Sequence, residues 1–142
     1  MILLDVNVLV EAGHRDAARH AASARWLQEV LAGPRPVGLA DVVLTGCLRV
    51  LTHRRVFSDP APPAVALDFV EAVRRAPAAV QVPATAATWQ TFGALLRDDD
   101  GLRGNLVPDA WLAALALSHG AWLATRDRGC ARFPGLSLMA PP

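Results

Sequence analysis

The sequence contains no lysine, and all 14 of its basic residues are arginine. Arginine is the better ligand for phosphate. However, the chain also has 10 glycines and 11 prolines and is rich in alanine, a bias typical of a GC-rich genome. The missing lysine is therefore not a signal for nucleic-acid binding. The net charge of +1 does not exclude RNA either, because an acidic cluster can mask a basic patch.

Cysteine and long apolar runs are also scarce. The two cysteines, Cys47 and Cys130, lie far apart without a C-x-x-C spacing, and there is no histidine-rich cluster. This argues against a zinc site or a disulfide scaffold and predicts a reducing, cytoplasmic setting. No segment approaches the roughly 18 consecutive apolar residues of a membrane-spanning helix. The acidic residue at position 5, with no basic leader, does not fit a secretory signal.

The length of 142 residues and the hydrophobic share of 53% predict one compact domain over positions 1–142. Short apolar runs predict strands, and apolar residues at helical spacing predict helices. The expected strands are 1–5, 37–40, 79–83, 121–125 and 136–139. The expected helices are 18–32, 41–56, 63–76, 88–97 and 108–120. This alternation predicts an α/β fold with a mostly parallel central sheet of about five strands flanked by helices.

Acidic residues follow several of these strands. Asp5 closes the first predicted strand, Asp41 follows the second, and Asp127 comes shortly after the fourth. Because the carboxyl ends of parallel strands meet at one edge of the sheet, we expect these side chains to converge. Asp109 begins the helix that leads into the fourth strand, and the loop at 97–107 is long enough to bring it to the same edge.

Clustered carboxylates repel one another, and a bound divalent cation relieves that repulsion. Oxygen ligands suit Mg²⁺ or Mn²⁺, which promote phosphodiester hydrolysis. Each acid also has a structural interpretation. Asp109 fits the first turn of a helix, Asp127 fits a turn, and Asp41 fits a helix N-cap. Asp5 is the hardest to explain in this way, because neither a cap nor a surface position accounts for an acid that closes an apolar strand.

Three blocks of the sequence resemble the PIN domain of VapC-type toxins from bacterial toxin–antitoxin pairs. They are LLDVNVLV, LVPDAWLAALALSHGAWLATRD and ARFPGLSL, and CLRVLTHRRVF is similar to an actinobacterial and mycobacterial branch. The resemblance covers essentially the whole chain and implies a single PIN-like domain. It also implies a metal-dependent endoribonuclease that cuts structured RNA such as tRNA or rRNA. A VapB-type antitoxin would inhibit it, and a homodimer is usual for the family.

The resemblance assigns roles to five residues. Asp5, Asp109 and Asp127 match the acidic positions that hold the metal in the family. Asn7 and Thr125 match an amide and a hydroxyl that support these acids by hydrogen bonds.

One position departs from the family pattern. Most PIN nucleases have a glutamate in the helix after the second strand, where this chain has Thr45 or Gly46. Whether one or two metal ions bind is therefore open. Asp41 is our first candidate to replace the glutamate, and residues 98–100, all aspartate, are the alternative.

Basic and apolar segments predict the partners. Arg49, Arg54 and Arg55, expected along the helix at 41–56, and Arg126, in the loop before Asp127, would form a basic border that holds the RNA backbone. The apolar helices at 18–32 and 42–54 would form a groove for a helix of the antitoxin.

Two alternatives remain beside the ribonuclease. A phosphotransferase of the haloacid dehalogenase type also begins with a strand and an aspartate. It needs a second acid two residues later, where this chain has Asn7, and a lysine, which this chain lacks. The other alternative is a degenerate PIN domain that binds RNA or a protein partner without cutting. Metal-dependent cleavage distinguishes this alternative from the ribonuclease.

Overall fold

The computed structural model describes all 142 residues as an α/β fold. Its five strands form one sheet in the order β3-β2-β1-β4-β5, and every neighbouring pair is parallel. The strands are β1 (Ile2–Leu4), β2 (Val37–Leu39), β3 (Ala79–Gln81), β4 (Trp122–Ala124) and β5 (Ser137–Met139). The predicted fold class and all five predicted strands are confirmed.

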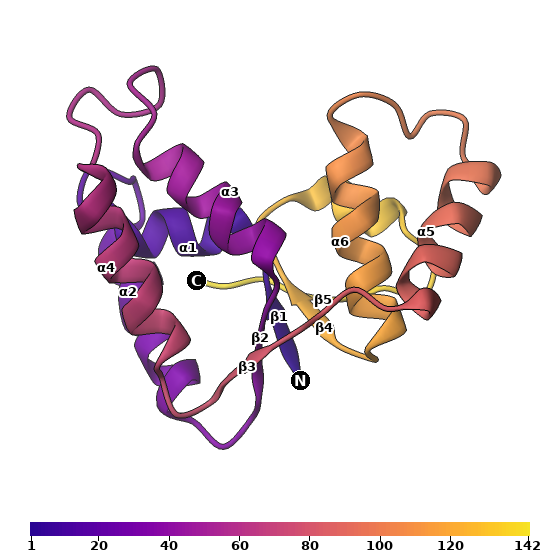
Figure 1. Cartoon of the computed structure of the whole chain (residues 1–142), viewed down its shortest axis with the longest axis horizontal. Coiled ribbons are helices and arrows are strands. Elements are labelled where there is room, and N and C mark those ends of the chain that lie inside the picture. The colour runs from indigo at the N-terminus through magenta and orange to yellow at the C-terminus, as the bar shows by residue number, and fades with distance from the viewer.

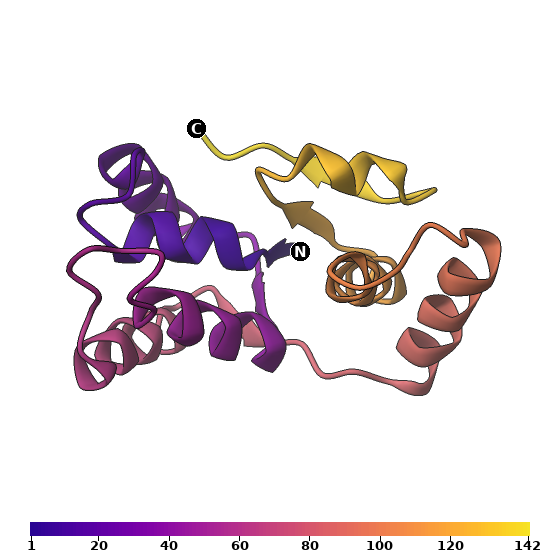
Figure 2. The same ribbon diagram turned by 90° about the horizontal axis from the view of Figure 1, so that it is seen from above.

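Six α-helices and one short 3₁₀ helix connect the strands. The α-helices are α1 (Val6–Gly13), α2 (His20–Ala32), α3 (Asp41–Leu51), α4 (Pro63–Arg74), α5 (Ala86–Asp98) and α6 (Leu106–Ser118), and the 3₁₀ helix η1 spans Arg128–Arg132. Helices α1–α4 group on one side of the strands, and α5 and α6 lie together on the other side (Figures 1 and 2). None of the helices combines the length and apolar character needed to cross a membrane.

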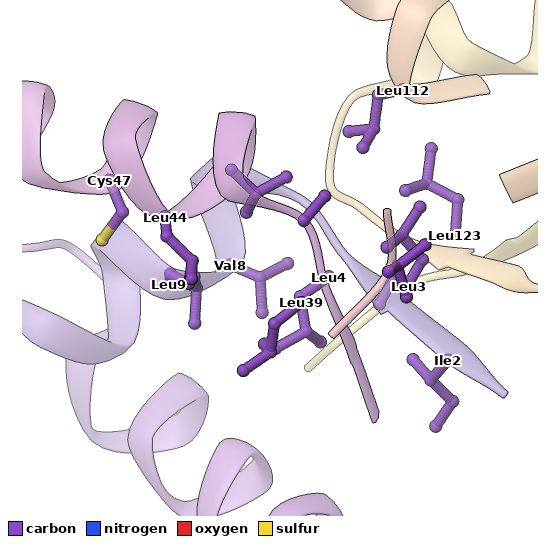
Figure 3. Packing of buried hydrophobic residues seen from close by; sticks show 14 of the residues in the cluster. Ile2, Leu3, Leu4, Val8, Leu9, Leu39, Leu44, Cys47, Leu112 and Leu123 are labelled. Atoms are coloured by element: carbon purple, nitrogen blue, oxygen red, sulfur yellow. The ribbon is translucent and has the colours of Figure 1, made fainter. Parts of the chain in front are cut away.

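The core lies between the sheet and both helical groups. Leu3, Leu4 and Leu123 on the central strands are completely buried. Side chains from α1 and α3 pack on one face of the strands, and Leu112 of α6 approaches from the other (Figure 3). The central strands β1 and β4 are therefore fixed from both sides, and the residues that follow them are held in place.

Two helices differ from the prediction. Helix α1 was not predicted: it begins directly after β1, and Asp5 is its N-cap. The helix predicted over 41–56 ends at Leu51, where Thr52 is the C-cap and its hydroxyl donates to the Leu48 carbonyl at 2.8 Å. The later arginines of that segment, Arg54 and Arg55, therefore lie in a turn rather than along the helix.

The strand order places a topological switch at the centre of the sheet. The chain runs β1, β2, β3 towards one edge and then returns to place β4 on the opposite side of β1. In open parallel sheets, functional sites form at the carboxyl end of such a switch. The residues that follow β1 and β4 are Asp5 and Thr125, and the Asp5 N–H donates to the Ala124 carbonyl at 3.0 Å.

Candidate active site

Asp5 is positioned by the junction of β1 and α1. One carboxylate oxygen, Oδ1, accepts a hydrogen bond from the Val6 N–H at 2.6 Å and thereby caps α1. The other oxygen, Oδ2, accepts from the Asn7 amide at 2.6 Å and from the Thr125 hydroxyl at 2.5 Å. This explains how an acid is tolerated at the end of a buried strand, because three donors face its charged form.

Thr125 connects the residues that follow β4 to those that follow β1. Its side chain is buried, with the residue 5% exposed. In addition to donating to Asp5, the hydroxyl oxygen accepts from the Asn7 amide at 3.1 Å and from the Asp127 N–H at 3.0 Å. The Arg126 N–H donates to Asn7 Oδ1 at 3.2 Å. Asn7 and Thr125 therefore support Asp5 by hydrogen bonds, as predicted from the resemblance.

The three predicted acids are close enough to influence one another's charge. Burial raises the pKa of Asp5, hydrogen bonds from Thr125, Val6 and Asn7 oppose this, and the charge of Asp127 raises it further. Burial also raises the pKa of Asp109, and the charges of Asp127 and Asp5 add to the effect. The loop before α6 has thus brought Asp109 back to the carboxyl edge of the sheet, as the sequence predicted.

A cavity of about 590 Å³ opens beside Asp5 and Asp109. Thr45, Gly46 and Arg49 of α3 line the same cavity. The position where most PIN nucleases have a glutamate therefore lies in the same cavity as Asp5 and Asp109, and in this chain it carries no carboxylate. Arg49 is the one positively charged side chain that lines this cavity, and it forms no ion pair with an acidic side chain.

The candidates to replace the glutamate lie elsewhere. Asp41 is the first residue of α3, Ala40 occupies the N-cap position that we predicted for Asp41, and the Gln81 amide donates to Asp41 Oδ1 at 3.3 Å. Asp99 is paired with Arg132 at 2.7 Å, and this pairing lowers the pKa of Asp99. Neither Asp41 nor residues 98–100 line the cavity beside Asp5.

The predicted basic residues fall into two groups. Arg49, Arg54 and Arg55 are exposed and make no ion pair, as a border for RNA requires. Arg126 differs, because its side chain is only 18% exposed and its Nε lies 2.6 Å from Glu11 Oε2. Glu11 belongs to α1, a helix that the sequence did not predict, so this contact was missed.

Cys130 is a further residue near the acids that sequence reasoning did not place there. It is buried on η1, and burial together with the charges of Asp127, Asp5 and Asp109 raises the pKa of its thiol to about 12. A thiol with this pKa stays protonated at neutral pH in the metal-free protein.

The donor set fits a hard divalent cation that keeps several waters. No three acidic, histidine or cysteine side chains stand close enough together to enclose a metal ion. Mg²⁺ commonly binds through only one or two carboxylates and completes its shell with water and phosphate oxygens. Burial raises the pKa of Asp5 and Asp109, and the charge of Asp127 raises both further, so a bound cation would relieve this repulsion. Asp5 and Asp109, which both line the cavity, are the carboxylates that would contact such a cation directly, and Asp127 lies close enough to raise the pKa of both.

The sequence matches the family model for the PIN domain over residues 2–136. Ribonuclease VapC43 of Mycobacterium tuberculosis is 41% identical over 141 residues, which cover 99% of this chain and 95% of the relative. Ribonuclease VapC31 of the same species is 37% identical over 145 residues, which cover 100% and 99%.

Solved structures share the fold at lower identity. The VapBC2 structure from Rickettsia felis, bound to a DNA fragment from its promoter, matches with a TM-score of 0.70 and 19% identity, covering 98% of both chains. M. tuberculosis VapC20, described as a sarcin–ricin loop cleaving toxin, matches with a TM-score of 0.65 and 21% identity, covering 96% of this chain and 99% of VapC20.

Proposed function

Because the chain belongs to the PIN-domain family, and within it to the VapC-type ribonucleases of toxin–antitoxin pairs, we propose that it hydrolyses structured RNA with a divalent cation held by Asp5, Asp109 and Asp127. The observation that carries this proposal is that Asp5 and Asp109 line one open cavity and that the charge of Asp127 reaches both of them. Mg²⁺ or Mn²⁺ bound there would lower the pKa of a water molecule and offset the charge of the phosphate.

The residues of the chain have distinct tasks in this reaction. Asn7 and Thr125 donate to Asp5 Oδ2 and thereby fix the direction of its remaining lone pairs. Asp109 contributes a partly exposed carboxylate from the start of α6. Asp127 uses Oδ1 to accept from the Gly129 N–H at 2.7 Å, which leaves Oδ2 free to bind. The supporting bonds keep Asp5 oriented before the substrate arrives.

Arg49 supports an RNA substrate, because it places an unpaired positive charge in the same cavity as Asp5 and Asp109. A phosphate group in this cavity would bind both the Arg49 guanidinium and the cation site. Arg54 and Arg55 extend the basic surface beyond the end of α3. We propose tRNA or rRNA as the class of substrate, and proteins of this kind recognise RNA mainly by shape and by unpaired bases.

A second cavity supports binding of a VapB-type antitoxin. It has a volume of about 530 Å³ and lies between α2 and α4, with Leu27, Leu31, Phe69 and Val73 among its lining residues. The sequence predicted such a groove between residues 18–32 and 42–54; the structure instead pairs the first of these segments with α4. We propose that an apolar helix of the antitoxin occupies this groove. A homodimer remains a prediction that size-exclusion chromatography tests.

Cleavage of total bacterial RNA by the purified chain tests the proposal. We expect discrete products with Mg²⁺ or Mn²⁺ and none with EDTA. Asp5→Asn keeps a good N-cap and Asp109→Asn keeps its shape, so both variants should fold and fail to cut. Arg15→Gln, far from the cavity on an exposed ion pair, is a matched control that should cut normally. A folded wild-type chain, free of antitoxin, that binds RNA without cutting it would establish the degenerate PIN domain instead.

A further inference from the structure

An ion pair outside the cavity ties the residues after β4 to two helices. Arg126 Nε lies 2.6 Å from Glu11 Oε2, and the two side chains are 18% and 24% exposed. The hydroxyl of Ser23, a buried residue of α2, donates to the same glutamate oxygen at 2.9 Å. The same oxygen of Glu11, on α1, therefore contacts both Ser23 of α2 and Arg126.

The same segment is attached to α1 at a second point. The Arg126 N–H donates to Asn7 Oδ1 at 3.2 Å, and Asn7 also donates to Asp5. Asn7 and Glu11 are four residues apart and therefore lie on the same face of α1. Arg126 contacts both of them, through its backbone and its side chain. Its sequence neighbours are Thr125, which donates to Asp5, and Asp127, whose charge acts on Asp5 and Asp109.

We infer that Arg126 is a positioning residue: its ion pair with Glu11 fixes residues 125–127 on α1 and so sets the Thr125 hydroxyl and Asp127 relative to Asp5. An arginine that contacts RNA presents its guanidinium to solvent, whereas Nε and Nη2 of Arg126 are both buried without a hydrogen-bond partner. The contact of Nε with Glu11 is therefore an ion pair of short distance rather than a well-aligned hydrogen bond. Arg128, two residues later, is exposed and makes no ion pair. The consequence for catalysis rests on the proposed function; the fixing of the segment does not.

Four variants test this inference: Arg126→Met, Arg126→Lys, Glu11→Gln and the matched control Arg128→Met. In the metal-free protein, Arg126→Met and Glu11→Gln should speed hydrogen exchange of the backbone amides at positions 126 and 127. Calorimetry should show Mn²⁺ binding weakened about tenfold or more, the usual loss when a residue supporting a metal ligand is removed. We expect kcat to fall without a rise in KM. Arg126→Lys should behave like the wild type, and Arg128→Met should change KM alone.

Glu11→Gln separates positioning from RNA contact. Glu11→Gln removes a negative charge, which by itself favours RNA binding, so a loss of cleavage in this variant cannot come from weaker RNA contact. Normal cleavage together with normal amide exchange in this variant would overturn the inference. The melting temperature identifies any variant that fails to fold. If Arg126→Met fails to fold, Glu11→Gln and Arg126→Lys still show whether the ion pair positions residues 125–127. A wild-type protein that neither binds Mn²⁺ nor cuts RNA would refute the proposed function. Amide exchange would then still confirm or refute the role of the ion pair.

Discussion

Replacing Thr125 with valine removes the hydroxyl that donates to Asp5 while keeping the shape of the side chain. The structure gives that hydroxyl three hydrogen bonds, of which the bond to Asp5 Oδ2 is the shortest at 2.5 Å. Thr125 is buried, so water does not replace the lost donor. Because valine has nearly the same volume, no cavity opens, and the main effect is the loss of the hydrogen bonds. The new methyl group cannot approach Asp5 Oδ2 as closely as the hydroxyl does, so a small displacement adds to the loss.

The size of the effect follows from these bonds. A hydrogen bond to a charged group contributes about 1.5–3 kcal/mol. The substitution also removes the bonds that the Thr125 oxygen accepts from the Asn7 amide and from the Asp127 N–H. These add little to the loss, because the Asn7 amide keeps its bond to Asp5 and water can reach the exposed Asp127. We expect Thr125→Val to lower the free energy of unfolding by about 2–3 kcal/mol. The fold should survive, because domains of this kind are stable by about 5–15 kcal/mol.

The loss should depend on pH. The Thr125 bond favours the ionised form of Asp5 and so lowers a pKa that burial has raised. Its contribution is present while Asp5 is ionised and disappears as the pH falls through the pKa of Asp5 in the folded protein. Without the bond that pKa rises further, so the acidic limb of the cleavage profile should move to higher pH.

Urea unfolding at pH 7, together with cleavage rates across pH, measures both effects. A double-mutant cycle with Asp5→Asn should give a coupling energy of about 1–2 kcal/mol, since the partner loses its charge. Thr88→Val is the matched control: Thr88 is a buried threonine bonded to Ser118 at 2.9 Å, far from the cavity. It should reduce stability and leave the pH profile unchanged. An unchanged unfolding midpoint and an unmoved acidic limb in Thr125→Val would refute this reasoning.

Three further predictions concern Asp109, the two cysteines and helix α3. Asp109→Asn should increase stability towards urea at pH 7 and not at pH 3, because burial and neighbouring charges penalise the ionised Asp109 of the wild type only where it is deprotonated. Cys47 and Cys130 should resist iodoacetamide at pH 8 until the protein unfolds, since burial raises the pKa of each thiol to about 12. Thr45→Glu should keep the melting temperature near that of the wild type, whereas Gly46→Glu should lower it, because a Cβ at Gly46 would lie 2.8 Å from a Val6 methyl carbon.

The sheet was predictable because each strand is a short apolar run with turn residues around it. Helix α1 was not, because its sequence, VNVLVEAG, contains three valines, which favour strands over helices. What makes it a helix lies outside the segment itself. Asp5 caps its first turn, and Val8, Leu9 and Val10 are buried against the rest of the core. Tertiary packing has overridden local preference here.

The acids were predictable for a similar reason. Asp5 and Thr125 follow adjacent parallel strands, and strand ends are visible in the sequence. The Arg126–Glu11 contact was not predictable, because it joins a strand end to a helix that the sequence did not reveal. The RNA role that we first assigned to Arg126 relied on its charge and its position in a loop, and neither of these indicates burial.

The absence of an acid at positions 45 and 46 of α3 has a structural counterpart in the packing of that helix. Gly46 lies so close to Val6 that any side chain there would push α3 away from α1, the helix that Asp5 caps. Thr45 uses its hydroxyl to donate to the Asp41 carbonyl at 2.8 Å, within its own helix. One turn later, Arg49 faces the same cavity. The wall that carries a glutamate in most PIN nucleases therefore offers a positive charge here. This favours direct binding of a phosphate by Arg49 over a second fully ligated metal ion.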